Sequence, residues 1–148
     1  MAEVNDLNQQ RRQLAGAGAD NTAALAFGGR NAPPDYQAVT ESWNGTNWTE
    51  VNDLNTARNY LAGLGSTTAA LAFGGTTPSV TGATEDWNGA NWSEVADLNT
   101  ARNNLVGALR GTTTASLAFG GEPSPPSVTT GTEEWSGSSN TTKTISTD

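Results

Sequence analysis

The chain has 148 residues, a formal net charge of −8, and neither cysteine nor histidine. Its length allows one ordinary domain, and the missing cysteines and histidines exclude disulfides, thiolate metal sites and the commonest general base. The acidic balance repels a nucleic-acid backbone and no apolar run approaches the roughly 18 residues of a membrane span, so we expect neither nucleic-acid binding nor membrane insertion.

The chain opens with a segment that returns twice further on. Residues 2–7 match residues 49–54 and 93–98. Both later copies are predicted to be the fourth strand of a repeated unit. Residues 1–8 are therefore predicted to form a fourth strand whose first three strands are missing from this chain.

A short apolar stretch that ends in two glycines occurs three times. Its glycine pairs begin at Gly28, Gly74 and Gly120, which are 46 residues apart. Such a stretch predicts a strand buried on both faces, and the glycine pair permits a sharp turn with positive φ. A period of this length is typical of propellers and repeat arrays.

The middle copy shows the whole unit. Four strands are predicted, at residues 59–65, 69–73, 83–87 and 91–98. Small residues fill the first strand, as an inner strand near a crowded axis requires, and Asn88–Gly89 predicts a tight hairpin between the last two strands. Four antiparallel strands per unit are typical of one propeller blade.

The residues Phe73–Gly74–Gly75, Trp87 and Trp92 resemble the repeats of the kelch family. Kelch repeats carry an apolar strand ending in a double glycine, then an aromatic, usually Tyr where this chain has Trp87, then a Trp in the last strand. The resemblance covers nearly the whole chain and implies an all-β fold, a β-propeller of four-stranded kelch-like blades. The recurring motifs Trp–Asn–Gly–x–Asn–Trp and Asp–Leu–Asn–x–Ala–Arg also look like the kelch-like repeats of uncharacterised phage and environmental bacterial proteins.

We expect a single domain, a three-bladed half-propeller with repeats at 9–54, 55–98 and 99–137 and a polar tail at 138–148. Known propellers have roughly 4–8 blades, and a three-blade arc leaves two apolar faces in water. We therefore predict a homodimer that closes a six-bladed ring, in which residues 1–8 of one chain add to the last blade of its partner. In the alternative arrangement, residues 141–147 supply that strand.

Tryptophans and paired acids are the first candidates for chemistry. The tryptophans recur at fixed places in the third and fourth strands, so we interpret them as core between blades rather than as sugar-stacking platforms; they are Trp43, Trp48, Trp87, Trp92 and Trp135. The adjacent acids Glu85–Asp86 and Glu133–Glu134 point to opposite faces of a strand and cannot act together as acid and base. We expect no catalytic residue, no metal site and no cofactor.

Arg11, Arg58 and Arg102 occupy one position of the repeat. In one interpretation they ring the mouth of a central channel and attract anions. In the other they pair with acids, which stand at two equivalent sets of positions: Asp6, Asp53 and Asp97, or Glu41, Glu85 and Glu133.

The loops after the double glycines differ most between repeats, and variable loops on a constant scaffold are where recognition usually occurs. The candidate binding residues in them are Arg30, Asp35, Tyr36, Thr77, Ser79, Glu122 and Ser124. The sequence thus predicts a non-catalytic structural or adhesive binding module with a protein or glycan ligand, on a virion or cell surface. The alternative is a glycan-binding lectin with pockets between blades. Residues 1–5 lack the features of a signal peptide.

Overall fold

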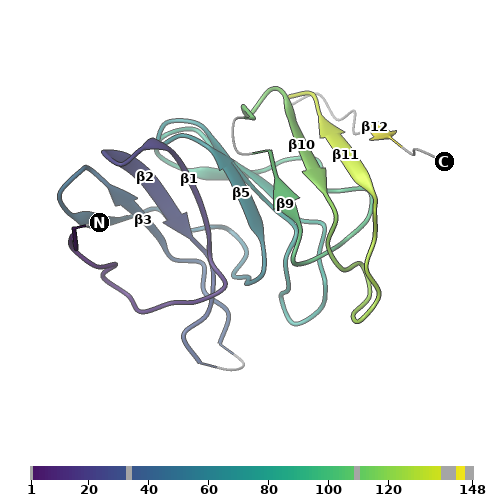
Figure 1. The fold of residues 1–148 in the computed structure, drawn as a ribbon, viewed down its shortest axis with the longest axis horizontal. Helices are drawn as coiled ribbons and strands as arrows, with labels where there is room; N and C mark the ends of the chain where they lie inside the picture. Colours follow the sequence, from purple (N-terminus) through teal and green to yellow (C-terminus); the bar gives the residue numbers. More distant parts are fainter. Residues whose placement is uncertain (1, 33–34, 109–110, 138–142, 146–148) are drawn as a thin grey trace.

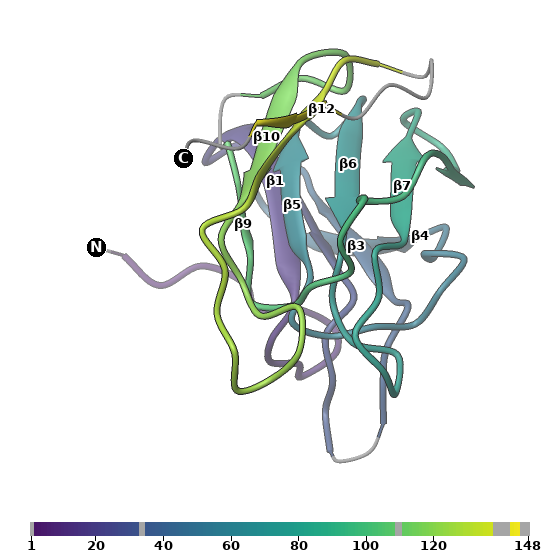
Figure 2. The same ribbon diagram turned by 90° about the vertical axis from the view of Figure 1, so that its right-hand side faces the viewer.

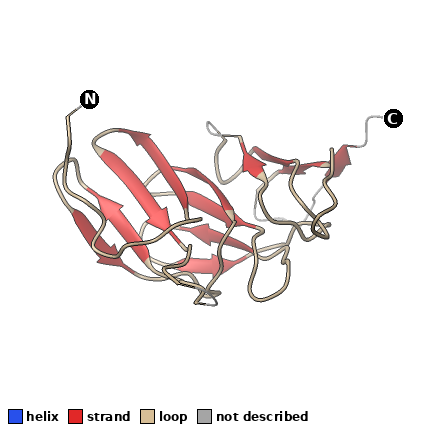
Figure 3. Ribbon diagram, turned by 60° about the horizontal axis from the view of Figure 1, so that its bottom comes forward, coloured by secondary structure: helices blue, strands red, loops and turns tan. Residues whose placement is uncertain are grey.

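The computed structural model describes residues 2–32, 35–108, 111–137 and 143–145. Within these ranges the chain forms strands and loops and no helix, as Figure 3 shows. The strands make three antiparallel four-stranded sheets, each built from four strands that follow one another in the chain. Figure 1 shows the three sheets side by side in chain order. The predicted all-β class and the repeated four-stranded unit are confirmed.

Each sheet has its strands in sequence order, with neighbours joined as hairpins. Sheet 1 contains β1 (Ala15–Asp20), β2 (Ala23–Phe27), β3 (Thr40–Trp43) and β4 (Trp48–Val51). Sheet 2 contains β5 (Ala62–Gly65), β6 (Ala70–Phe73), β7 (Thr84–Trp87) and β8 (Trp92–Glu94). Sheet 3 contains β9 (Val106–Gly107), β10 (Ser116–Phe119), β11 (Thr132–Trp135) and β12 (Lys143–Ile145).

The sheets pack through the phenylalanine that ends each second strand. Phe27 and Phe73 are 0% and 3% exposed, and they lie against the glycines of the next sheet's first strand, Gly63 and Gly107. A Cβ at Gly107 would stand 2.6 Å from Phe73 Cζ, which is closer than real Cβ contacts permit. The small residues predicted for the first strand are therefore required by the ring that packs on them.

The fourth strands end earlier than predicted, since β8 stops at Glu94 rather than at residue 98. An aspartate side chain accounts for the early end. Asp97 Oδ1 accepts a hydrogen bond of 3.2 Å from Thr84 N, and Asp53 Oδ1 accepts one of 3.0 Å from Thr40 N. Because these side chains accept bonds from the third strand's backbone, they compete with the strand ladder, and the chain turns toward the next sheet.

Residues 2–8 form no strand within this chain; their predicted pairing with the last blade of a second copy stays a prediction. Asn5 Nδ2 donates to Thr46 O at 2.9 Å, and Asn8 Nδ2 donates to Trp48 O at 2.9 Å. The connection between sheets 1 and 2 makes the same two bonds to sheet 2 through Asn52 and Asn55. The N-terminal segment therefore lies on sheet 1 as an inter-sheet connection would.

The third sheet is completed by the chain's own C-terminal part. In β12, Lys143 pairs with Glu134 and Ile145 pairs with Thr132. The prediction of a polar tail is thus corrected at residues 143–145, whose β-branched Thr144 and Ile145 favour a strand. The edge assigned to a partner's residues 1–8 is already occupied, as in the alternative arrangement; the rest of 138–148 lies outside the described residues.

Candidate functional site

The three repeat arginines form buried ion pairs with the glutamates, the second of the two acid sets. Arg11 Nη2 lies 2.8 Å from Glu41 Oε1, with both side chains 0% exposed. Arg58 and Glu85 repeat the pair at 3.2 Å. The third pair is Arg102 with Glu133.

These pairs fasten each sheet to the connection that precedes it. Arg58 Nη1 donates to Ala83 O at 2.5 Å, while Glu85 accepts from the backbone N–H groups of Asn55 and Thr56 at 2.7 and 3.2 Å. Burial lowers the pKa of Arg58 below its usual value, against the opposing effect of Glu85. The glutamate therefore compensates a charge that the sheet has removed from water.

Burial leaves these arginine side chains no surface to offer an anion in a channel. A hollow of about 520 Å³ forms where the turns between first and second strands of the three sheets meet. It is lined by uncharged residues, among them Gly18, Gly65 and Gly111. The predicted ring of Arg11, Arg58 and Arg102 therefore has no counterpart at this opening.

The adjacent acids of the third strands lie in different surroundings, as expected for neighbours in a strand. Glu85 is 0% exposed and bound to Arg58. Asp86 is on the other face, where its Oδ1 is buried and accepts no hydrogen bond among the described residues. Desolvation raises the pKa of Asp86 above its usual value. The two carboxyl groups share no site.

One tryptophan of each sheet has the same structural role. The indole N–H groups of Trp43, Trp87 and Trp135 donate to a carbonyl in the first hairpin of their own sheet at 2.8–2.9 Å. Trp92 is 5% exposed and packs edge-on to Phe27, with ring centroids 4.9 Å apart. Trp48 is partly exposed. The buried positions of Trp43, Trp87 and Trp92 suit core packing, while Trp48 and Trp135 are only half-buried.

The three variable loops leave the sheets at the same end of the molecule, the lower end in Figures 1 and 2. Each begins with a bridge to the segment before its own first strand: Arg30 to Arg12, Thr76 to Asn59 and Glu122 to Asn103. Of the candidate binding residues, three are exposed and four are half-buried; these are Asp35, Ser79 and Ser124, and Arg30, Tyr36, Thr77 and Glu122 respectively. Residues 33–34 of the first loop lie outside the described residues.

A polar hollow of about 600 Å³ lies at this end, beside the first loop. The polar residues that line it, besides the ion-paired Arg11, are Gln9, Gln10, Arg12, Arg30 and Asn31. Arg12 and Arg30 form no ion pair among the described residues, and the buried Arg30 Nε makes no hydrogen bond there. We call these five residues the loop-end hollow.

Only Arg30 of this hollow was predicted from the sequence. Arg12 was missed because it stands beside the repeat arginine Arg11. A signal was present, since the equivalent positions in the other repeats are Asn59 and Asn103. An arginine that departs from an otherwise constant position marks a local function better than the three arginines that recur.

Within the described ranges, no group of three or more acidic side chains is placed to hold a metal ion. No helix long and apolar enough to cross a membrane occurs in that part of the chain. A scan against protein-family models finds no match, and a search of curated proteins finds no similar sequence.

Proposed function

We propose that this chain is a non-catalytic binding module, built from kelch-like propeller blades, that recognises a carboxylate-bearing protein partner at the loop-end hollow. One observation carries the proposal. Arg12 and Arg30, the two arginines without an ion pair in the described part of the chain, line the same hollow. They do so in a chain of net charge −8.

The chemistry of the hollow favours an acidic ligand. Arginine binds carboxylates through paired N–H donors, and two guanidinium groups in one concave site attract negative charge that the rest of the surface repels. The amides of Gln9, Gln10 and Asn31 add neutral donors and acceptors at the rim. Such a site takes a glutamate or aspartate side chain, or a C-terminal carboxylate.

A peptide-binding measurement tests this function. We expect a fluorescent hexaglutamate peptide to bind the full chain at low salt, and a hexaglutamine peptide to bind at least tenfold more weakly. Arg12→Gln and Arg30→Gln should each weaken hexaglutamate binding about tenfold, the loss of one charge-assisted pair. Glu122→Gln, at the position equivalent to Arg30 in the third loop, is the matched control. Equal binding of both peptides contradicts the proposal.

The glycan alternative is tested in the same format. An array of sulfated and carboxylated glycans should give no signal that depends on Arg12 or Arg30 if the ligand is an acidic peptide. A specific glycan signal that Arg30→Gln removes would replace the peptide by an acidic sugar at the same hollow.

We further propose that a second copy completes the three sheets to a six-bladed ring. The exposure of the phenylalanine that ends each second strand supports this. Phe119 of sheet 3 is 38% exposed, whereas Phe27 and Phe73 are 0% and 3% exposed. At Gly28 and Gly74, an added Cβ would meet a leucine and a backbone carbonyl of the next sheet. At Gly120 it would meet nothing within 4 Å. The outer face of sheet 3 thus lacks the neighbour that its counterparts have.

Backbone hydrogen bonds between the sheets of one chain support a geometry for this junction. Tyr60 N donates to Gln13 O at 3.0 Å, and Asn104 N donates to Tyr60 O at 3.0 Å. The series therefore ends in Gln13 N on sheet 1 and Asn104 O on sheet 3, neither of which has a partner among the described residues. One more step between two chains would join them.

A second series ends in the same way. Gly29 N donates to Arg58 O at 2.8 Å, and Gly75 N donates to Arg102 O at 2.9 Å. The next members are Gly121 N and, on sheet 1 of another copy, Arg11 O. Because two independent series leave a donor and an acceptor at opposite ends of the chain, head-to-tail contact satisfies both. In a closed pair of chains the two junctions are equivalent.

Light scattering on the full chain tests the ring. One chain has a mass of 15.3 kDa, and we expect the measured mass to be twice that value. Phe119→Asp should give monomers, because it places a charge in the junction. Val128→Asp, at a residue that is 78% exposed in the third loop, should leave the dimer intact. A monomeric wild-type chain refutes the ring and leaves the peptide measurement unaffected.

A further inference from the structure

Two positions of the repeat lie at the loop end of each sheet. The first precedes the first strand, and we call it the entry position; it is occupied by Arg12, Asn59 and Asn103 in sheets 1, 2 and 3. The second follows the double glycine, and we call it the loop position; it is occupied by Arg30, Thr76 and Glu122. Within each sheet the two positions are joined by a backbone bridge.

The entry residue of each later sheet makes a side-chain contact with the sheet before it. Asn103 Nδ2 donates a hydrogen bond of 2.9 Å to Thr76 Oγ1, so the entry position of sheet 3 meets the loop position of sheet 2. Between sheets 1 and 2 the loop position is Arg30, whose side chain has no acceptor. Asn59 Nδ2 donates there to Gln13 Oε1 instead, at 3.1 Å.

Arg12 and Glu122 are the end members of this series. Arg12 is the one charged residue at the entry position, and Glu122 is the one acid at the loop position. Arg12 is exposed and Glu122 is half-buried. Neither side chain forms an ion pair or a hydrogen bond among the described residues. The two ends of the chain therefore carry opposite charges at positions that meet wherever one sheet follows another.

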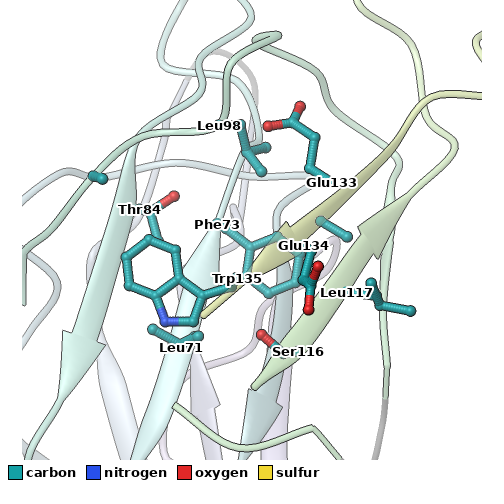
Figure 4. A pocket seen from close by; sticks show the side chains of 11 residues that line it. Leu71, Phe73, Thr84, Leu98, Ser116, Leu117, Glu133, Glu134 and Trp135 are labelled. Carbon is teal, nitrogen blue, oxygen red and sulfur yellow. The ribbon is translucent and has the colours of Figure 1, made fainter. Parts of the chain in front are cut away.

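The packing between sheets 2 and 3 shows what a further junction would contain. In Figure 4, Phe73 of sheet 2 and Trp135 of sheet 3 lie between these two sheets, whereas Leu117 points away from both. Leu117 is 37% exposed on the outer face of sheet 3. At the loop end of that face, Glu122 has the place that Thr76 has beside sheet 3. The entry residue of a further sheet would therefore meet Glu122.

We propose that the carboxylate recognised by Arg12 is that of Glu122 in a second copy of this chain, so that each junction between copies contains one Arg12–Glu122 ion pair. This inference rests on the proposed function, because it names the partner of the loop-end hollow. Arginine and glutamate are longer than the Asn103–Thr76 pair at the equivalent place. Their charges therefore meet further toward solvent, where desolvation costs less.

The ion pair also selects the head-to-tail arrangement. A junction of two sheet 3 faces would contain Glu122 twice and no Arg12, and a junction of two sheet 1 faces would contain Arg12 twice and no Glu122. Like charges brought together in this way oppose association. Within one copy, Arg12 and Arg30 are bridge partners of the same charge, which is unfavourable. A carboxylate from a second copy offsets that repulsion.

Charge reversal in two separate chains tests the ion pair. Arg12→Glu and Glu122→Arg should each weaken the dimer by about tenfold or more, because each variant places like charges at both junctions. Mixed in equal amounts, the two variants should form a heterodimer as strong as the wild-type dimer, since each junction then holds one positive and one negative side chain. Sedimentation of fluorescently labelled full chains at falling concentration measures all three. A variant that had failed to fold would not be rescued by mixing.

Asp35→Arg is the matched control, because it makes the same charge change in the first loop. That loop contacts sheet 2 rather than the junction, since Gln37 O accepts a hydrogen bond of 3.1 Å from Arg58 N. The control should dimerise like the wild type. The inference is overturned if the wild-type chain is monomeric, if either reversal leaves the dimer unchanged, if Asp35→Arg weakens it as much as Glu122→Arg, or if the two weakened variants fail to assemble when mixed.

Hexaglutamate binding to the monomeric Phe119→Asp variant separates this inference from the proposed function, because no second copy competes for Arg12 there. If Arg12→Gln weakens peptide binding in that background while Glu122→Arg leaves the wild-type dimer unchanged, the hollow binds carboxylates and the second copy is overturned as its partner. If the mixed variants assemble but hexaglutamate does not bind, the ion pair between copies stands and recognition of a free acidic peptide is refuted.

Discussion

The indole Nε1 of Trp92 donates a hydrogen bond of 3.1 Å to Thr40 Oγ1 and joins sheet 2 to sheet 1. The two residues are 52 positions apart in the chain. The bond therefore belongs to the packing between repeats rather than to the hairpins within one repeat.

Trp92→Ala should destabilise the chain by about 3–5 kcal/mol, because it removes a large buried aromatic ring. Trp92→Phe should cost less, losing part of the ring and a hydrogen bond worth roughly 1 kcal/mol. Urea denaturation followed by circular dichroism measures both. Trp48→Ala, at the partly exposed equivalent in sheet 1, is the control in the monomeric Phe119→Asp background. Equal losses at Trp92 and Trp48 there would mean that the sheets do not pack through this ring.

Gly74 and Gly120 have nearly the same backbone conformation, with φ of 65° and 68°. They differ in surroundings, because a Cβ at Gly74 would stand 2.6 Å from Arg102 O while one at Gly120 would meet no atom. Alanine at either position carries the left-handed strain of about 1–2 kcal/mol, so any further loss in Gly74→Ala measures the contact between sheets. In thermal unfolding of monomers, we expect Gly74→Ala to lose more stability than Gly120→Ala.

In the proposed dimer, Gly120 has a neighbour in the second copy, as Gly74 has one within the chain. If a second copy covers Gly120, then Gly120→Ala should also weaken the dimer, which sedimentation at falling concentration detects. A dimer of unchanged strength would argue against the head-to-tail junction.

Removing one partner of a buried ion pair should be costly. Arg58→Met leaves the Glu85 carboxylate buried without its cation, and the expected loss is about 3–5 kcal/mol. The double variant Arg58→Met/Glu85→Leu should lose less than the two single changes added together. Additive losses in chemical denaturation would show that the charges do not interact across their 3.2 Å.

Two aspartates should change the pH dependence of stability in opposite directions. Burial raises the pKa of Asp86 in the folded chain, so the carboxyl holds its proton longer when folded, and stability falls as the pH rises from its ordinary value of 3.8 through the raised one. Asp86→Asn should remove this fall and stabilise the chain at pH 7.

Asp20 is the matched case of opposite sign. Hydrogen bonds from Thr22 lower its pKa, so its contribution to stability is present above pH 3.8 and is lost as the pH falls through the lowered value. Asp20→Asn should destabilise the chain at neutral pH. Melting temperatures measured from pH 3 to pH 7 test both variants, and the same sign of effect at pH 7 would contradict the assignment.

The features that recur in the sequence were predictable. The spacing of Gly28, Gly74 and Gly120 predicts the positions of the second strands. One of the two acid sets predicted to pair with the recurring arginines, Glu41, Glu85 and Glu133, is the set that pairs with them. Repetition is informative here because each copy must satisfy the same backbone and the same neighbour.

The features that occur once were missed. β12 has neither the tryptophan nor the Asn–Gly hairpin of β8, so the repeat pattern predicts a tail there, although Thr144 and Ile145 suit a strand. The loop-end hollow combines Arg12, before the first strand, with Arg30, after the second, and only the fold brings them together.

Each sheet uses four strands that are consecutive in the chain, and none borrows a strand from another part of the molecule. During synthesis, each sheet can therefore form as soon as its own four strands have emerged from the ribosome. No sheet needs a strand from the C-terminal part of the chain before it can form, except sheet 3, which contains that part. Because Phe27 of sheet 1 is buried against Gly63 and Trp92 of sheet 2, the first sheet to emerge stays partly uncovered until the second is complete. We expect nascent chains from which residue 98 has emerged from the ribosome to protect Phe27 from solvent, and chains from which residue 62 has not emerged to leave it open to chaperones.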